Sequence, residues 1–204
     1  MTLFPRRDVI DGPLDNVLDV NGWDLAKTLR LLLKGNAVAI EWLTSPLVYS
    51  GSSAFRDACR ALAGEIVQQE AVARHYLHLG AAGLDRIEGD EAALKRVFYV
   101  LRPAVALRWL ADHPAEAVAP MNFRALLEDA DMAPGTRAIT EDLLARKAVT
   151  RELGRGRVPR EIIDYIAASF AFARSHWPAR ARAPSQAARR AVDRFFRQWI
   201  AEAA

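Results

Sequence analysis

Strand-like patterns are confined to the first twenty residues of the chain. Residues 8–11 and 16–20 are short β-prone runs, and the turn-forming pair Gly12-Pro13 lies between them. Two strands alone do not form a stable sheet, because both edges and one face stay unpaired. This strand pair therefore needs helices packed against it or further strands, and self-association through the exposed strand edge is one way to supply them.

The pattern from residue 22 onward is helical almost throughout. Asn21 and Asp24 form an N-terminal capping pair, and Gly35-Asn36 is a typical helix end. Pro103 lies inside a long apolar run and predicts a kinked helix. We expect helices at about 22–34, 37–43, 53–70, 74–84, 90–112, 122–130, 136–148, 159–176 and 185–203, with a loop at 154–157. The chain is thus predicted to be mainly α, an α-helical bundle with a small N-terminal β part.

Composition narrows the class of protein further. Hydrophobic residues make up 51% and charged residues 26%, which is typical of a globular protein. No apolar run approaches the length of a membrane span, and the first residues lack a signal-peptide core, so we expect a cytoplasmic protein with no membrane partner. The single cysteine, Cys59, excludes an internal disulfide and a cysteine-based zinc site, and its helical context favours a buried thiol over a nucleophile.

Positive charge is concentrated at the C-terminal end. Residues 1–150 contain 17 Lys and Arg against 20 Asp and Glu, whereas residues 151–204 contain 11 Arg against 5 acidic residues. Such asymmetry is typical of a segment that faces nucleic acid. A preference for Arg and Ala throughout the chain explains part of it, so a solvated helix face is the favoured interpretation and a nucleic-acid surface the alternative.

Several motifs recur in a distinctive order along the chain. They are residues 21–27 (NGWDLAK), 31–36 (LLLKGN), 41–49 (EWLTSPLVY), His75-Tyr76, 94–103 (LKRVFYVLRP), Trp109 and Pro120-Met121. Together they resemble a bacterial family of predicted nucleotidyltransferases of the DNA polymerase β superfamily, some of whose members are associated with RNA repair. The resemblance covers roughly residues 8–165.

The resemblance implies a fold and a chemistry. Proteins of this superfamily open with a Gly-Ser turn that holds the nucleotide phosphates, followed by an Asp-x-Asp strand and a third carboxylate on a later strand. The carboxylates hold two Mg²⁺ ions, which align the attacking and leaving oxygens during transfer of a nucleoside monophosphate from a nucleoside triphosphate to a hydroxyl. The acceptor hydroxyl would belong to RNA or another molecule.

The chain departs from the family pattern at its start. Asp19, between Leu18 and Val20, matches the third carboxylate, and is the candidate catalytic residue and Mg²⁺ ligand. No Asp-x-Asp follows Gly51-Ser52 at the expected distance, and Asp129-Ala130-Asp131 lies far downstream, so both are interpreted as chance matches. We therefore expect an N-terminally truncated nucleotidyltransferase that is inactive alone. Its parts would be a core remnant (1–50), a helical domain (51–150) and an Arg-rich helical extension (151–204).

Two groups of side chains are candidates for nucleotide or phosphate binding. Lys27, Arg30 and Lys34 recur at helical spacing just after the Asp19 strand, so they share one helix face that could meet a triphosphate or a nucleic-acid backbone. The alternative is the solvated side of an amphipathic helix.

The second group is Lys95, Tyr99 and Arg102, a polar stripe on an otherwise apolar helix. A buried Arg must find a carboxylate or phosphate partner. Glu41, which has apolar neighbours, is the candidate structural partner of Arg102 or Lys95, so a structural ion pair competes with a ligand role.

The remaining polar and aromatic residues favour structural roles. His75 and His78 have a spacing that suits a metal, but no third ligand is evident in the sequence. The five tryptophans are spread over separate helices, as core residues are. Because the expected Asp-x-Asp is missing, the alternative to an enzyme is a non-catalytic helical module that binds nucleotide or RNA through its basic side chains.

Overall fold

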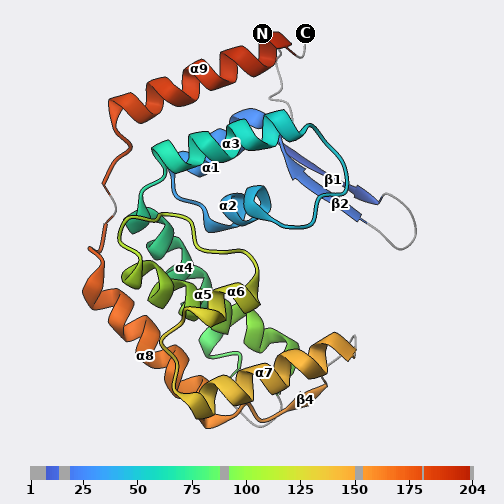
Figure 1. Cartoon of the computed structure of the whole chain (residues 1–204), viewed down its shortest axis with the longest axis vertical. Helices are drawn as coiled ribbons and strands as arrows, with labels where there is room; N and C mark the ends of the chain where they lie inside the picture. Colours follow the sequence, from blue (N-terminus) through green and yellow to red (C-terminus); the bar gives the residue numbers. More distant parts are fainter. Residues whose placement is uncertain (1–7, 14–18, 88–91, 150–153, 181, 203–204) are drawn as a thin grey trace.

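The computed structural model describes residues 8–13, 19–87, 92–149, 154–180 and 182–202. Its described residues form nine α-helices, one 3₁₀ turn (Leu94–Arg96) and two small antiparallel sheets. The predicted fold class is confirmed, because helices dominate and a β-hairpin stands at the N-terminal end (Figure 1). None of the helices within the described ranges combines the length and the apolar character that a membrane span needs.

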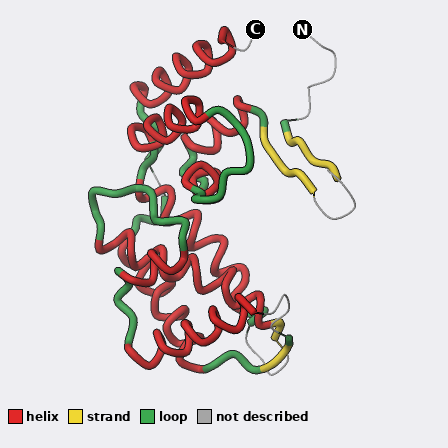
Figure 2. The backbone as a smooth tube through the Cα atoms, turned by 45° about the vertical axis from the view of Figure 1, so that its right-hand side comes forward, coloured by secondary structure: helices red, strands yellow, loops and turns green. Residues whose placement is uncertain are grey.

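The hairpin consists of β1 (Val9–Pro13) and β2 (Asp19–Trp23), with Asp11 opposite Asn21. The predicted boundaries were wrong at two points. Gly12-Pro13 belongs to β1, where a proline at a strand end is tolerated because it need not donate to the ladder. Asn21 is in β2, so Asp24 caps the following helix without it, and its Oδ1 accepts the Lys27 N–H at 2.6 Å. The hairpin projects from the helices (Figure 2).

Four helices form a layer beside the hairpin: α1 (Leu25–Leu33), α2 (Ala37–Thr44), α3 (Ser53–Ile66) and α9 (Gln186–Glu202). Asn36 and Ser52 cap α2 and α3 with their side-chain oxygens, as polar N-cap residues do. The last helix, α9, lies across α1 and α3 (Figure 1). Its Phe195 and Trp199 pack against Phe55 of α3, with ring centroids 6.2 and 4.9 Å away.

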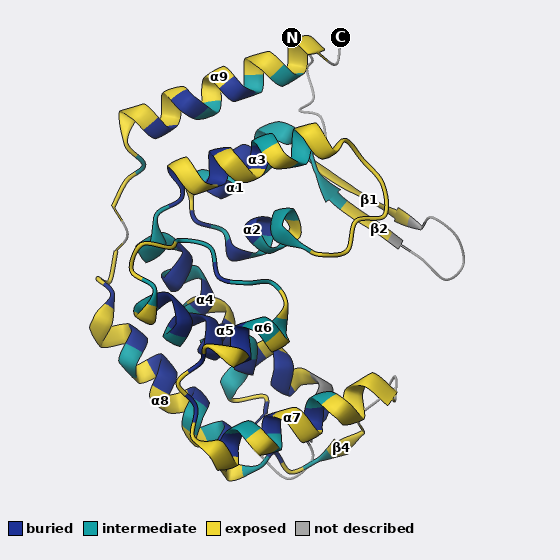
Figure 3. Ribbon diagram, viewed as in Figure 1, coloured by how far each residue is buried: buried dark blue, intermediate teal, exposed yellow. Residues whose placement is uncertain are grey.

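The main core lies between α4 (Gln69–Leu84), α5 (Val97–Asp112) and α8 (Arg160–His176). Two helices, α6 (Phe123–Glu128) and α7 (Pro134–Val149), pack against α5 and α8 respectively. Figure 3 shows the buried residues gathered on α5 and on the sides of α4 and α8 that face it. Pro103 lies inside α5, as the sequence predicted, and its side chain is buried in the core.

A second sheet was not predicted from the sequence. Residues Ala92–Ala93 (β3) pair with Arg155–Gly156 (β4), in a segment that was expected to be a loop. The prediction of a helix over 90–112 was wrong at its start, because residues 92–93 pair as a strand and α5 begins at Val97. The division of the chain into 1–50, 51–150 and 151–204 stays a prediction. Helices of each segment contact helices of another, because α9 packs on α1 and α3 and α8 packs on α5.

Close packing of α4, α5 and α8 gives a first prediction. A Cβ added to Gly80 would lie 2.3 Å from Phe170 Cζ and 3.0 Å from Pro103 Cβ, closer than van der Waals contact allows. Gly80→Ala should therefore lower the free energy of unfolding by about 1–3 kcal/mol, measured by urea denaturation. Gly64→Ala on α3 is the matched control, because its added Cβ meets nothing within 4 Å and should stabilise the helix by about 0.5–1 kcal/mol. Equal effects at both positions would contradict the packing.

Candidate functional site

The candidate catalytic residue, Asp19, is the first residue of β2 and pairs with Pro13 of β1. Its backbone is described, whereas its side chain lies outside the described part of the structure. The expected strand position of Asp19 is thus confirmed, and its role as a metal ligand stays a prediction. The hairpin that carries it leaves Ile10 and Val20 exposed, at 58% and 43% of their surface.

Lys27 is the predicted phosphate ligand that lies nearest to the hairpin. Its Nζ is 3.1 Å from Asp8 Oδ1, and the Asp24 backbone N–H donates to the Asp8 carbonyl at 3.0 Å. The start of α1 is therefore tied to the start of β1. The Lys27–Asp8 pair is partly solvent-exposed and worth little, about 0–1 kcal/mol, so a phosphate could replace the carboxylate at small cost.

Arg30 and Lys34 continue along α1 away from the hairpin. Both side chains are exposed, and at 1.5 Å per residue Lys34 is about 10 Å further along the helix axis than Lys27. Both lie toward the C-terminal end of α1, where positive charge is favourable beside the helix dipole. The structure thus places Lys27 and Arg30 on one short helix with Lys34 as its C-cap, and Lys27 pairs with Asp8, the residue before β1.

The Arg102 side chain points into the protein and makes three hydrogen bonds there. Its Nε donates to Glu41 Oε1 at 2.9 Å, and its two terminal nitrogens donate to the carbonyls of Met121 and Pro120 at 2.7 and 3.1 Å. Tyr76 OH donates to the same Glu41 oxygen at 2.8 Å. The Glu41–Arg102 pair weighed from the sequence is therefore present, and all three guanidinium nitrogens of Arg102 make hydrogen bonds within the protein.

Burial controls the ionisation of this group. The side chains of Arg102 and Glu41 are only 18% and 16% exposed. Burial first, and then the nearby Glu41 carboxylate, raise the pKa of Tyr76 well above its usual value. The Tyr76 hydroxyl therefore keeps its proton and acts as a donor, so the single Glu41 oxygen accepts from both neighbours. The hydrogen bonds of Glu41, Tyr76 and Arg102 thus join α2, α4, α5 and residues 120–121.

The other two members of the second predicted group lie elsewhere. Tyr99 is 75% exposed, next to Arg86 and Arg96 in a shallow cavity of about 290 Å³. The side chain of Lys95 is outside the described residues. Tyr99 and Arg102 therefore do not form one stripe, because the first faces solvent while the second faces the core.

Cys59 and the two chance motifs have structural positions. Cys59 is buried, as expected, and burial raises the pKa of its thiol to about 11, so it is not a thiolate nucleophile at neutral pH. Ser52 caps α3 and Asp129 ends α6. Within the described ranges, no three His, Cys, Asp or Glu side chains come together as a metal site.

His75 holds the start of α2 in place. Its Nδ1 accepts the Ala37 backbone N–H at 3.2 Å, and its Nε2 lies 3.1 Å from Asn36 Nδ2. Burial, with the neighbouring His78, lowers the pKa of His75 below 6.5. The ring is therefore neutral at physiological pH, as an acceptor must be.

The tryptophans are mostly core residues, as predicted, with one difference. Trp109 and Trp177 are buried, and Trp23 and Trp199 are partly buried against the core. Trp42 is 45% exposed and stacks on Trp23 with ring centroids 4.4 Å apart, at the junction of hairpin and α2. The exposed loop residues Leu47, Val48 and Tyr49 follow α2, and this loop runs beside the hairpin (Figures 1 and 2).

A family model matches nearly the whole length of the chain. The model of the RlaP family, described as the RNA repair pathway DNA polymerase beta family, matches residues 1–198. The chain belongs to this family. The resemblance stated from the sequence is thereby confirmed, since the RlaP match includes the Asp19 strand, α1 and the Glu41–Arg102 pair.

A bacterial relative shows how much of a longer protein the match covers. The uncharacterized protein YcgL of Bacillus subtilis (strain 168) is 38% identical over 149 residues, which are 72% of this chain and 56% of YcgL. The chain thus spans little more than half the length of this relative. No solved structure matches it.

The Glu41 group gives a second prediction. Arg102→Met should lower the free energy of unfolding by about 1–3 kcal/mol, because it leaves two carbonyls without their donor and the largely buried Glu41 carboxylate without its charged partner. Arg124→Met, at an exposed arginine of α6, should change it by less than about 0.5 kcal/mol. Chemical denaturation of both variants and the parent measures these changes in the free energy of unfolding. An Arg102 variant as stable as the parent would contradict the structural role and restore the ligand role.

The neutral His75 ring gives a third prediction. The unfolded chain takes up a proton near pH 6.5, whereas folded His75 resists it, so the free energy of unfolding should decrease as the pH falls below about 6.5. The slope from one proton is at most about 1.4 kcal/mol per pH unit. His75→Gln should remove this part of the slope in urea titrations at pH 7.5, 6.5 and 5.5, and His176→Gln, at an exposed histidine, should not. An unchanged slope in His75→Gln would contradict the assignment.

Proposed function

We propose that this chain forms part of a polymerase-β-type nucleotidyltransferase, which transfers a nucleoside monophosphate from a nucleoside triphosphate to a hydroxyl acceptor such as an RNA end. The observation that carries the proposal is the RlaP match across residues 1–198. The matched region contains Asp19 at the start of β2, and the helix that follows β2 has Lys27 in its first turn. Nucleoside triphosphates and RNA imply a cytoplasmic setting.

Each residue of the proposed site has a separate task. Asp19 would supply one carboxylate to Mg²⁺, whose chemistry is to neutralise charge on the transferred phosphoryl group. Lys27 would exchange its Asp8 partner for a triphosphate oxygen, and Arg30 and Lys34 would extend the positive face toward the rest of the nucleotide or the acceptor. Arg102 and Glu41 would hold α2 in place, and thereby the hairpin that α2 contacts through the Trp23–Trp42 stack.

The described residues do not by themselves fit a magnesium site, since no group of three potential ligands comes together among them. We assign no step of the transfer to a metal held by this chain alone. The proposal instead makes Asp19 one ligand of a site whose other carboxylates would come from a segment outside these 204 residues.

A non-catalytic module that binds RNA is the second candidate. It is favoured by α9, which exposes Arg189, Arg190, Arg194 and Arg197 while its apolar side packs on α1 and α3. Such a row of cations contacts a phosphate backbone without reading its sequence. The two candidates differ in one measurable respect, incorporation of nucleotide.

Our fourth prediction separates them. The 204-residue chain with Mg²⁺, radiolabelled ATP and a short RNA should incorporate no label above a no-enzyme control, because one expected carboxylate cannot hold two ions. In a protein that joins this chain to a Gly-Ser and Asp-x-Asp segment, Asp19→Asn should slow incorporation at least about a hundredfold, since metal stabilisation is worth several kcal/mol. Asp57→Asn, at an exposed acid of α3, is the control and should keep the parent rate.

Three outcomes would contradict parts of this proposal. Incorporation by the 204 residues alone would show that the carboxylates present suffice. An unaffected rate in Asp19→Asn would show that Asp19 is not the third ligand. Binding of RNA in a calorimetric titration, with no incorporation by the joined protein, would favour the non-catalytic module.

A further inference from the structure

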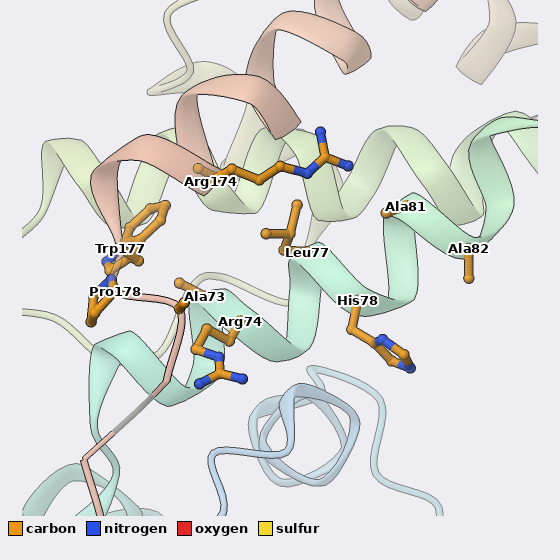
Figure 4. A pocket seen from close by; sticks show the side chains of 11 residues that line it. Ala73, Arg74, Leu77, His78, Ala81, Ala82, Arg174, Trp177 and Pro178 are labelled. Carbon is orange, nitrogen blue, oxygen red and sulfur yellow. The ribbon is translucent and has the colours of Figure 1, made fainter.

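A cavity of about 650 Å³ opens between α4 and the C-terminal end of α8. Figure 4 shows Leu77 in its middle, Arg174 of α8 on one side, Arg74 and His78 of α4 on the other, and Trp177 at one end. The rest of the lining is five alanines and a proline. Cavities of roughly 300–1,000 Å³ with apolar walls and few polar groups are the usual size and character of small-molecule sites.

The charge of the lining has one sign. Its polar side chains are two arginines and a histidine, and no carboxylate is among the lining residues. Neither Arg74 nor Arg174 has an ion pair or hydrogen bond with any residue that the structure describes. Arg74 is also half-buried, and a cation that is partly removed from water without a partner costs free energy. An anion bound between the two guanidinium groups would offset that cost.

The apolar walls of the cavity favour an anionic ligand that also carries an apolar group. Leu77 and the alanines form an apolar surface, and the Trp177 ring, which is 7% exposed, closes one end. A flat, largely apolar group fits such walls, whereas a small inorganic anion would leave most of the cavity empty. Guanidinium groups bind phosphate through paired N–H donors. The ligand should therefore combine a planar ring with a phosphate.

We propose that this cavity binds a nucleoside phosphate, with the base against Leu77 and Trp177 and the phosphate between Arg74 and Arg174. The site is separate from the one proposed for catalysis, because its lining includes none of Asp19, Lys27 or the other cations of α1. The proposal therefore does not rest on nucleotidyl transfer. A free nucleotide and a phosphorylated RNA end carry the same chemistry, and the experiment below distinguishes them.

Our fifth prediction is tested by calorimetry on the 204-residue chain. AMP should bind, whereas adenosine and inorganic phosphate should each bind at least about tenfold more weakly, because each lacks one half of the ligand. Arg74→Gln and Arg174→Gln should each weaken AMP binding about tenfold, the expected effect of losing a charged hydrogen bond. Arg124→Gln on α6 removes the same charge outside the cavity and should leave AMP binding unchanged.

A second readout places the ligand independently of the arginines. The indole N–H signal of Trp177 should move on addition of AMP in a ¹⁵N-correlated NMR spectrum, and Trp177→Phe identifies that signal. The signals of Trp42, at the hairpin junction, and of Trp199, on α9 against Phe55, should stay in place. Movement of these signals without that of Trp177 would overturn the assignment.

The source of the phosphate follows from a comparison of ligands. A single-stranded RNA with a 5′-phosphate that binds more tightly than both AMP and the unphosphorylated strand identifies an RNA end, whereas equal or weaker binding than AMP identifies a free nucleotide. Absence of AMP binding up to about 5 mM, or equal losses in Arg74→Gln and Arg124→Gln, would overturn the proposal.

Discussion

The arrangement of this protein depends on one buried carboxylate. Glu41 accepts hydrogen bonds from Arg102 and Tyr76, and Arg102 also holds the carbonyls of residues 120–121. A carboxylate removed from water is costly unless it is paired and hydrogen-bonded, so α2 can dock only where both donors reach it. Since α2 also carries Trp42, which stacks on Trp23 at the end of β2, the same interaction positions the strand that begins at Asp19.

Local chemistry made most of the helical fold predictable. Helix starts were readable where a polar side chain caps the first turn, as Asp24 does, and helix ends where a glycine or a proline follows. Cys59 could be placed inside because its neighbours repeat with helical spacing. The family was recognisable from ordered motifs, and these coincide with the start of α1, the Glu41 helix and the Arg102 helix. All these signals act over a few residues.

Features that join distant segments could not be predicted in the same way. The sequence left Arg102 with a structural and a ligand role, because its carbonyl partners are set by the path of residues 120–121. The β3–β4 pair joins residues more than sixty positions apart, and two-residue strands have no pattern of their own. The cavity between α4 and α8 was missed for the same reason, since Arg74 and Arg174 are a hundred positions apart and come to line one cavity only through helix packing.

The position of α9 has a consequence for the order in which the chain can fold. The layer of α1 and α3 precedes the main core in the sequence, yet the helix that covers it follows that core, with Phe195 and Trp199 as the residues that close over Phe55. Contacts between such distant segments form slowly, because a long loop must close first. Until α9 docks, the apolar side of α3 stays open to solvent or to chaperones, while α4, α5 and α8 can form their core without it. The layer of α1 and α3 is thus completed only when α9 reaches it.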